Sequence, residues 1–240
     1  MQSLSPAQIL ALWERGRAQH ALDRALTILA VATPGASRAA LADLPIGERD
    51  ARLLKLRALV FGPRAEGFAE CPHCGERIEF PFESTVLEGH APSRSPSAPA
   101  HHETQTNGTT ISFRLPTSRD LAEIVAAPDS SQALRRLVHR CVSSPNDDEL
   151  PDETIEAVSR AMLVVDPQAE ITLRLSCPAC GRNWDLLFDT AEFFWREISA
   201  HARRLLREID TLARAYGWSE REILSLPAQR RQTYLEMLAA

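Results

Sequence analysis

Hydrophobic residues recur at intervals of three and four through the first third of the chain, the spacing typical of amphipathic helices. Ser5 followed by Pro6 predicts the start of a first helix, because serine caps helices and proline fits their first turn. A second helix is expected through residues 21–29 and a third through residues 47–61, which Gly62 ends. Each helix has one apolar face and therefore needs a partner surface.

The hydrophobic period changes from helical to alternating at residues 77–83. In this "RIEFPFE" stretch, Ile78, Phe80 and Phe82 alternate with polar residues and Pro81, which predicts a half-buried edge strand. Alternation returns in three later stretches, residues 111–115, 171–175 and 184–188. A small β platform is therefore expected beside the helices.

The segment between the first strands has a different composition. Residues 84–109 are rich in serine, proline, threonine and histidine and offer almost nothing to bury, so we expect a flexible linker there. Helices should follow from Thr117 or Ser118, through residues 131–141 and through residues 155–162.

A long helix is predicted from about residue 191. Its apolar positions are separated alternately by four and three residues, which is a heptad-like seam. They are Ile198, Ala202, Leu205, Ile209, Leu212 and Tyr216. Gly217 should end this helix, and Ser219 with Glu222 predicts a capping box that opens the next one.

Two short segments, "AECPHCGERIEFPFE" and "LSCPACGRNWDLLFD", repeat the pattern C-P-x-C-G followed by an alternating strand. One reading is a thiol-disulfide enzyme in which Cys71 is the nucleophile and Cys74 resolves the mixed disulfide. That chemistry usually places the motif at a helix N-terminus, which lowers the thiol pKa. Here glycine and then a strand follow each motif, so the expected helix is missing.

A shared zinc site accounts for both repeats. In a C-P-x-C-G turn the glycine lets the chain leave as a strand, and two thiolates can reach one metal ion. Two such knuckles supply four thiolates, the closed set of a structural Zn²⁺ site. The predicted ligands are Cys71, Cys74, Cys177 and Cys180. The fifth cysteine, Cys141, is interpreted as a small core residue.

We therefore predict an α+β fold that is mostly helical, with a small antiparallel β platform forming a split zinc ribbon and a long C-terminal helix. Its expected parts are an N-terminal helical region (1–66), a first knuckle and strand (67–83), the linker (84–109), a strand and helical insertion (110–168), a second knuckle with strands (169–190) and a C-terminal helical region (191–240).

Composition, charge and the absence of known motifs limit the classes of function that the chain can have. The chain has 240 residues and a formal net charge of -5, which makes a nucleic-acid partner unlikely. No stretch resembles a transmembrane helix or a secretory signal, so a cytoplasmic protein without membrane contact is expected. The nucleotide-binding, serine-hydrolase and zinc-protease motifs are absent, so no enzymatic activity is expected.

The apolar surface of the C-terminal region suggests a binding role. Its aromatic and aliphatic residues exceed what a small platform can cover, so they either form an internal helical bundle or dock on a partner protein. The candidate partner-binding residues are Phe194, Trp195, Tyr216, Trp218, Ile223, Leu224 and Tyr234. Arg203, Arg204 and Arg207 alternate with acidic residues on the same helix, which favours a solvated helix face over a nucleic-acid strip.

Four segments together resemble bacterial proteins that are encoded beside phage-tail-like contractile injection systems and are similar to the T-even phage baseplate hub assembly chaperone. They are "LPIGERDARLLKLRALVFGPRAEGFAECPHCGERIEF", "ISFRLPTSRDLAEI", "CPACGRNWDLLFDTAEFFWREI" and "LARAYGWSEREILSLPAQRRQTYLEML". The "YGWSEREIL" run and the paired knuckles are the most specific parts. The resemblance covers most of the chain from Leu44 onward, without the linker.

The resemblance implies a non-enzymatic assembly factor, or a minor component, that binds baseplate, hub or spike subunits. It also places Tyr216, Gly217, Trp218, Ser219, Ile223 and Leu224 in the functional C-terminal segment. The main alternative is a zinc-ribbon regulator that contacts nucleic acid or a transcription complex, which the acidic balance disfavours.

Overall fold

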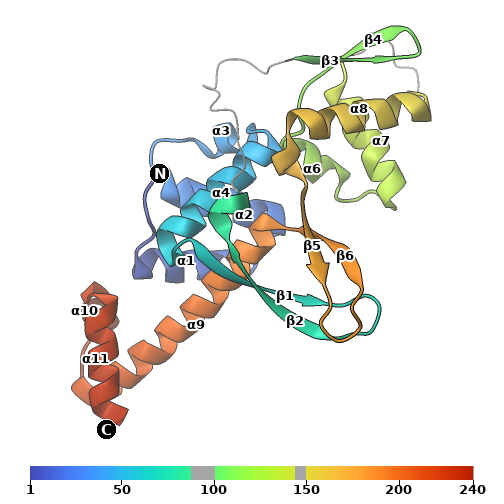
Figure 1. Ribbon diagram of the computed structural model, residues 1–240. Coiled ribbons are helices and arrows are strands. Elements are labelled where there is room, and N and C mark those ends of the chain that lie inside the picture. Colours follow the sequence, from blue (N-terminus) through green and yellow to red (C-terminus); the bar gives the residue numbers. More distant parts are fainter. Residues whose placement is uncertain (88–100, 144–149, 240) are drawn as a thin grey trace.

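The computed structural model describes residues 1–87, 101–143 and 150–239 (Figure 1). A helical body holds the N-terminal region and the first part of the long C-terminal helix. Two β-hairpins extend from one side of this body, a smaller helical unit lies above them in this view next to α3 and α4, and the last two helices lie at the far end of the long helix (Figure 1).

The helical body consists of α1 (Pro6–Gly16), α2 (Ala21–Ala32), α3 (Arg38–Ala42), α4 (Ile46–Phe61) and α9 (Thr190–Tyr216). Helices α1, α2 and α4 all pack on α9, and their apolar faces share one core. Ser5 caps α1, as the sequence predicts. Gln8 completes a capping box with Ser5, which was not predicted. The body therefore joins two ends of the chain around the seam of α9.

The β platform consists of two separate antiparallel hairpins. Strand β1 (Arg64–Glu70) pairs with β2 (Arg77–Glu83), and β5 (Ile171–Ser176) pairs with β6 (Asn183–Phe188). A one-turn helix, α5 (Ser84–Leu87), follows β2. Each C-P-x-C-G motif forms the turn of one hairpin, so both cysteine pairs lie at hairpin tips.

Strand β1 was not predicted from the sequence, because its inner positions are small rather than hydrophobic. Gly67 lies opposite Phe80 in the hairpin register. A Cβ atom on Gly67 would lie 2.3 Å from the Phe80 ring, so the glycine makes room for the aromatic ring. The strand owes its place to this cross-strand packing and not to its own hydrophobic pattern.

A second unit, inserted between the hairpins, has its own core. It contains β3 (His102–Thr106), β4 (Thr109–Phe113), α6 (Ser118–Ile124), α7 (Ser130–Cys141), α8 (Asp152–Val165) and the 3₁₀ turn η1 (Pro167–Ala169). Its buried residues are Phe113, Val138, Cys141, Ile155, Val158 and Met162. Cys141 is a core residue, as predicted.

The predicted linker at 84–109 needs correction at both ends. Residues 84–87 form α5, and strand β3 occupies residues 102–106, paired with β4. The turn between β3 and β4 is Asn107-Gly108, and both residues have positive φ angles, of 49° and 74°. Asn-Gly is the sequence that favours such a hairpin turn, and this signal outweighs the polar composition. Residues 88–100 lie outside the described part of the chain.

The insertion is attached to the helical body at the start of α4. The backbone N–H of Gly47 donates to Asp166 Oδ2 at 2.9 Å, and a Cβ atom on Gly47 would lie 1.8 Å from Asp166 Oδ1. The backbone N–H of Ile46 donates to the Pro116 carbonyl at 3.1 Å. The free backbone N–H groups at the N-terminus of α4 thus find hydrogen-bond acceptors near the start and near the end of the insertion.

The C-terminal region continues with α10 (Glu220–Ser225) and α11 (Ala228–Ala239), which both contact α9. Gly217 ends α9 in the left-handed conformation, and Ser219 with Glu222 forms the predicted capping box. Arg231 of α11 is buried, and it donates to Glu208 Oε2 of α9 at 3.1 Å and to the Leu226 carbonyl at 2.7 Å.

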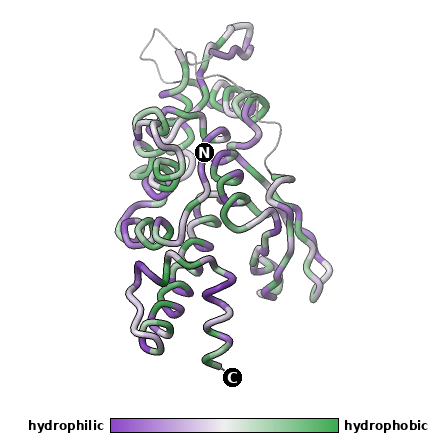
Figure 2. Tube along the Cα trace, turned by 90° about the vertical axis from the view of Figure 1, so that its left-hand side faces the viewer, coloured by the Kyte–Doolittle hydropathy of each residue, from purple (hydrophilic) through white to green (hydrophobic). Residues whose placement is uncertain are grey.

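The predicted fold class is confirmed: the chain is mostly helical, with small antiparallel sheets and a long C-terminal helix. Figure 2 shows hydrophilic and hydrophobic positions interleaved along the helices. Among the described residues, no helix combines the length and the apolar character that a bilayer crossing requires.

Candidate metal centre

The two cysteine turns have the same backbone structure. In the first, the Cys71 N–H donates to the Glu76 carbonyl at 2.8 Å, and the Gly75 N–H donates to the Cys71 carbonyl at 2.9 Å. The second turn repeats both bonds at 2.9 Å, from Cys177 to Arg182 and from Gly181 to Cys177. The repeat seen in the sequence is therefore also a structural repeat.

Each turn needs its glycine. Gly75 has φ of 75° and Gly181 has φ of 70°, the left-handed region that other L-residues adopt at a cost. This conformation reverses the chain directly after the second cysteine, so that the next residues start β2 or β6. A thioredoxin-type thiolate lies at the start of a helix. Neither cysteine motif of this chain opens a helix.

The hairpin tips bring all four predicted cysteine ligands together. The sulfur atoms of Cys71 and Cys180 are 3.8 Å apart, those of Cys74 and Cys177 are 3.6 Å apart, and all four lie within 4.8 Å of one another. Four metal–sulfur bonds of about 2.3 Å in a tetrahedron would place the sulfurs about 3.8 Å apart. The four thiols can hold one metal ion without a large movement.

The thiols strongly affect one another's protonation. The backbone N–H of Cys180 is the main cause that lowers the pKa of Cys177, to about 7. The backbone N–H of Glu76 lowers the pKa of Cys74, but desolvation and hydrogen bonds with the three other thiols outweigh it and raise that pKa to about 12. Four thiolates this close repel one another, so a cation is required for all of them to ionise.

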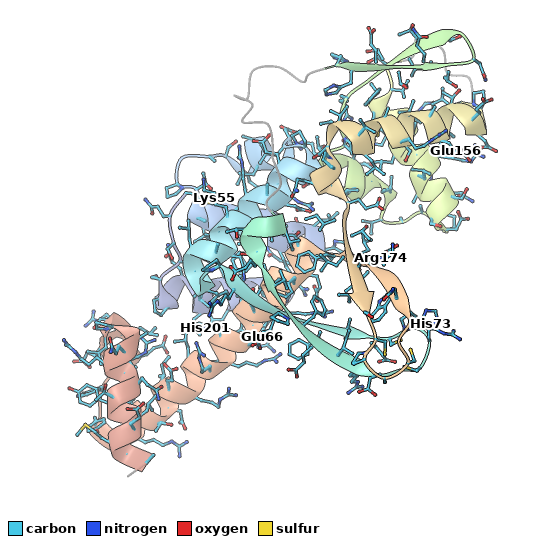
Figure 3. The ribbon with its side chains drawn as sticks, in the orientation of Figure 1. Lys55, Glu66, His73, Glu156, Arg174 and His201 are labelled. Atoms are coloured by element: carbon cyan, nitrogen blue, oxygen red, sulfur yellow. The ribbon has the colours of Figure 1, made fainter. Side chains whose placement is uncertain are left out.

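The other nearby groups do not enter the sulfur cluster. Cys71 and Cys177 are buried, whereas Cys74 and Cys180 are exposed. In Figure 3 the labelled His73 lies on the outer side of its turn, and its Nδ1 atom lies 3.5 Å from an Arg182 guanidinium nitrogen. Within the described residues, the metal-binding group consists of the four cysteines alone.

Aromatic rings hold the two hairpins against the base of α9. The ring centroid of Phe82 on β2 lies 5.4 Å from that of Phe188 on β6 and 5.4 Å from that of Phe193 on α9. Phe188 and Phe193 are 5.0 Å apart, which closes the triangle. Such aromatic pairs add about 0.5–1.5 kcal/mol each beyond the burial of their surface.

A partly buried ion pair connects α4 to α9 next to these rings. Arg57 donates to both carboxylate oxygens of Glu197, at 2.9 and 2.6 Å, and to the Gly62 carbonyl at 2.6 Å. The Arg57 side chain is 3% exposed and the Glu197 side chain is 24% exposed, so the arginine is shielded from water and the glutamate is partly accessible. The two residues are 140 positions apart in sequence, and no local pattern could have indicated that they meet.

A comparison with protein families shows to which family the chain belongs. A family model described as T4 bacteriophage base plate protein matches residues 16–195, three quarters of the chain. The chain belongs to this base plate family. No curated protein and no solved structure matches it.

The match to the base plate family includes both cysteine turns and the whole insertion, and it ends early in α9. It starts well before Leu44, where the sequence resemblance was placed, and it spans residues 84–109 as well. The "YGWSEREIL" run lies outside the matched range. The affiliation of this base plate protein therefore rests on the body, the hairpins and the insertion.

Two of the predicted partner-binding residues of this base plate protein belong to its core. Phe194 is 1% exposed and Trp195 is 8% exposed, and both lie in the core of the helical body. A Cβ atom on Gly16 of α1 would lie 2.4 Å from the Trp195 ring, so α1 packs directly on that ring. The expectation that Phe194 faces a partner is wrong for the folded chain, and Trp195 keeps only a small accessible part of its ring, because α1 and α4 cover these residues.

The remaining five predicted residues lie together at the far end of α9. Tyr216 stacks on Trp218 with ring centroids 4.6 Å apart, and the Tyr234 ring lies 4.9 Å from Trp218 at a steep angle. All three rings are half-buried, as is Leu224, whereas Ile223 of α10 is fully buried. The structure thus brings the three aromatic rings into one partly exposed cluster, whereas Leu224 packs against the core of the helical body.

Proposed function

We propose that this protein is a non-enzymatic assembly factor, or a minor baseplate or hub component, of a phage-tail-like contractile injection system. The observation that carries the proposal is membership of the base plate family over residues 16–195. It works in the cytoplasm, where such particles assemble, and it binds a hub, spike or baseplate subunit. A chaperone would leave the finished particle, whereas a minor baseplate or hub component would stay in it.

The proposed metal is Zn²⁺. Four thiolates in a tetrahedral arrangement are the usual ligand set of structural zinc, and soft sulfur ligands disfavour magnesium or calcium. Cysteine supplies every ligand, so no coordination position is left for water or substrate. A closed site of this kind supports folding rather than hydrolysis, which is why we propose no enzymatic role.

The metal has a structural task that follows from the topology. Cys74 and Cys177 are separated by 103 positions, and their hairpins continue from α4 and into α9 respectively. Bound Zn²⁺ would cross-link these segments at the tips, while Arg57 and the phenylalanine triangle fix them at the base. The metal would thus add to the packing of α1, α2 and α4 on α9, which sets the direction of α9 and with it the position of α10 and α11.

The surface we propose for the partner subunit is the C-terminal aromatic cluster, formed by Tyr216, Trp218 and Tyr234, together with Ile223 and Leu224 of the neighbouring helix α10. Tyrosine and tryptophan combine a large apolar area with a polar end, which makes them frequent anchors of protein interfaces. Two exposed side chains of α11 extend the same end of the molecule, since Met237 is 64% exposed and Leu238 is 42% exposed.

Native capture of the tagged protein from its own cells, after nuclease treatment and with mass spectrometry of the captured proteins, tests the proposal. Recovery of hub, spike or baseplate subunits supports it, and the Trp218→Ala variant should recover markedly less of them. Recovery of polymerase subunits, or of partners that nuclease removes, would instead favour the zinc-ribbon regulator and refute the assembly role.

A further inference from the structure

A small cavity between α1, α2 and α9 is lined mainly by arginine and tryptophan. Its volume is about 350 Å³. The lining residues are Trp13, Arg17, Arg24, Trp195, Ser199 and Arg203. Three arginines therefore line one cavity in a chain whose formal net charge is -5.

Arg24 is held in place at the floor of the cavity. Its Nε donates to the Gly16 carbonyl at 2.8 Å, and its guanidinium carbon lies 4.8 Å from the centroid of the Trp195 ring. Its nearest carboxylate, Glu192, is 3.8 Å away and is shared with Arg196 at 3.0 Å. The two terminal nitrogens of Arg24 thus keep most of their capacity to donate to a ligand.

Arg17 and Arg203 form the rim of the cavity. The guanidinium carbon of Arg17 lies 5.0 Å from the centroid of the Trp13 ring. Both arginines are exposed, and neither forms an ion pair with a residue in the part of the chain that the structure describes. Stacking on an indole ring occupies the face of a guanidinium group and leaves its in-plane N–H donors available.

We propose that this cavity binds the carboxylates of an acidic segment in a protein partner. Carboxylates match the forked, charged donors of arginine, which bind them through charge-assisted hydrogen bonds. A nucleic-acid site would instead spread its cations along a stripe that follows the phosphate backbone. Here the positive groups meet at one cavity, so a short acidic segment is the better match.

This inference rests on the proposed function only for the identity of the partner as a baseplate subunit. The cavity lies in the helical body, and it is built from other residues than the C-terminal aromatic cluster. Acidic-peptide binding can therefore be present or absent independently of the capture of baseplate subunits. The two results together show which of the two proposals fails.

Fluorescence anisotropy with a fluorescein-labelled peptide of alternating glutamate and glycine tests the proposal on the full chain. The Arg17→Gln/Arg203→Gln variant should bind this peptide at least about tenfold more weakly than the wild type. The charge-matched control is Arg136→Gln/Arg230→Gln, since both of these arginines are exposed and lie on α7 and α11. Its affinity should stay within about twofold of the wild type.

Four results would overturn the proposal. They are equal losses in the two double variants, equal binding of a glutamine-glycine peptide, tighter binding of single-stranded DNA of matched charge, and no binding of the acidic peptide at low salt. Circular dichroism of both double variants establishes that they are folded. Because the substituted arginines are exposed and form no ion pair within the described residues, and only the Arg17–Trp13 contact is lost, the variants should unfold close to the wild-type temperature.

Discussion

Replacement of a single cysteine should release the metal and expose how much stability it supplies. In the Cys177→Ser variant the cluster keeps three thiols, and the serine hydroxyl is a poor substitute for the sulfur that lies 3.6 Å from Cys74. We expect the purified variant to contain no stoichiometric zinc. The wild type should contain one zinc ion per chain, because all four sulfurs lie within 4.8 Å of one another.

The expected loss follows from binding linkage. A ligand that binds only the folded state, at a free concentration about a thousand times its dissociation constant, stabilises the fold by about 4 kcal/mol. Loop closure gives a similar scale, since a covalent cross-link across a loop of about 100 residues contributes about 4.7 kcal/mol. The sequence separation of 103 between Cys74 and Cys177 places this site in that range. We therefore expect Cys177→Ser to lower the free energy of unfolding by about 4 kcal/mol.

Urea unfolding followed by circular dichroism, with and without a zinc chelator, measures this loss. The chelator should destabilise the wild type by about as much as the substitution does, and it should not affect the variant further. Cys141→Ala is the matched control, because Cys141 is buried in the other core; it should keep its zinc and its response to the chelator. Unchanged zinc content and stability in Cys177→Ser would refute the shared site.

Three further predictions concern the supports of the platform and of the insertion. Arg57→Met should lower the free energy of unfolding by about 2 kcal/mol, because it removes charge-assisted hydrogen bonds to Glu197 and the bond to the Gly62 carbonyl, while Glu197 remains partly solvated; a loss below about 0.5 kcal/mol in chemical denaturation would contradict this. Burial alone would raise the pKa of Asp120, but hydrogen bonds from an arginine and a threonine outweigh it and hold this pKa below its ordinary value of 3.8. The stability it contributes is therefore complete above about pH 4 and is lost as the pH falls further, so unfolding curves of Asp120→Asn and the wild type should differ at pH 7 and converge in acid. Gly67→Ala should lower the thermal midpoint, because its Cβ would lie 2.3 Å from the Phe80 ring, and an unchanged midpoint would show that the ring moves freely.

The helices and the cysteine cluster could be predicted because their signals are local and repeated. Ser5, Gly217 and Ser219 are capping residues at helix ends, and each occupies the predicted role. The paired C-P-x-C-G motifs implied one site because each motif supplies two thiols and a structural Zn²⁺ site takes four. Here spacing and residue type alone determined the geometry.

The errors arose where packing between distant segments decides the structure. Strand β1 has no hydrophobic alternation of its own and depends on the Phe80 ring opposite Gly67. Phe194 and Trp195 were predicted to face a partner because a helical pattern shows an apolar face but not what covers it. The cover comes from α1 and α4, more than 130 positions earlier in the chain. The Arg57–Glu197 pair and the arginine-tryptophan cavity are likewise assembled from separate helices.

Electron microscopy of particles from cells that lack this chain, compared with cells complemented by it, tests the assembly role most directly. We predict that complete contractile particles are lost without the chain, that sheath or tube fragments without a finished baseplate accumulate, and that complementation restores whole particles. Normal numbers of complete particles in cells without the chain would contradict the proposed role in baseplate assembly.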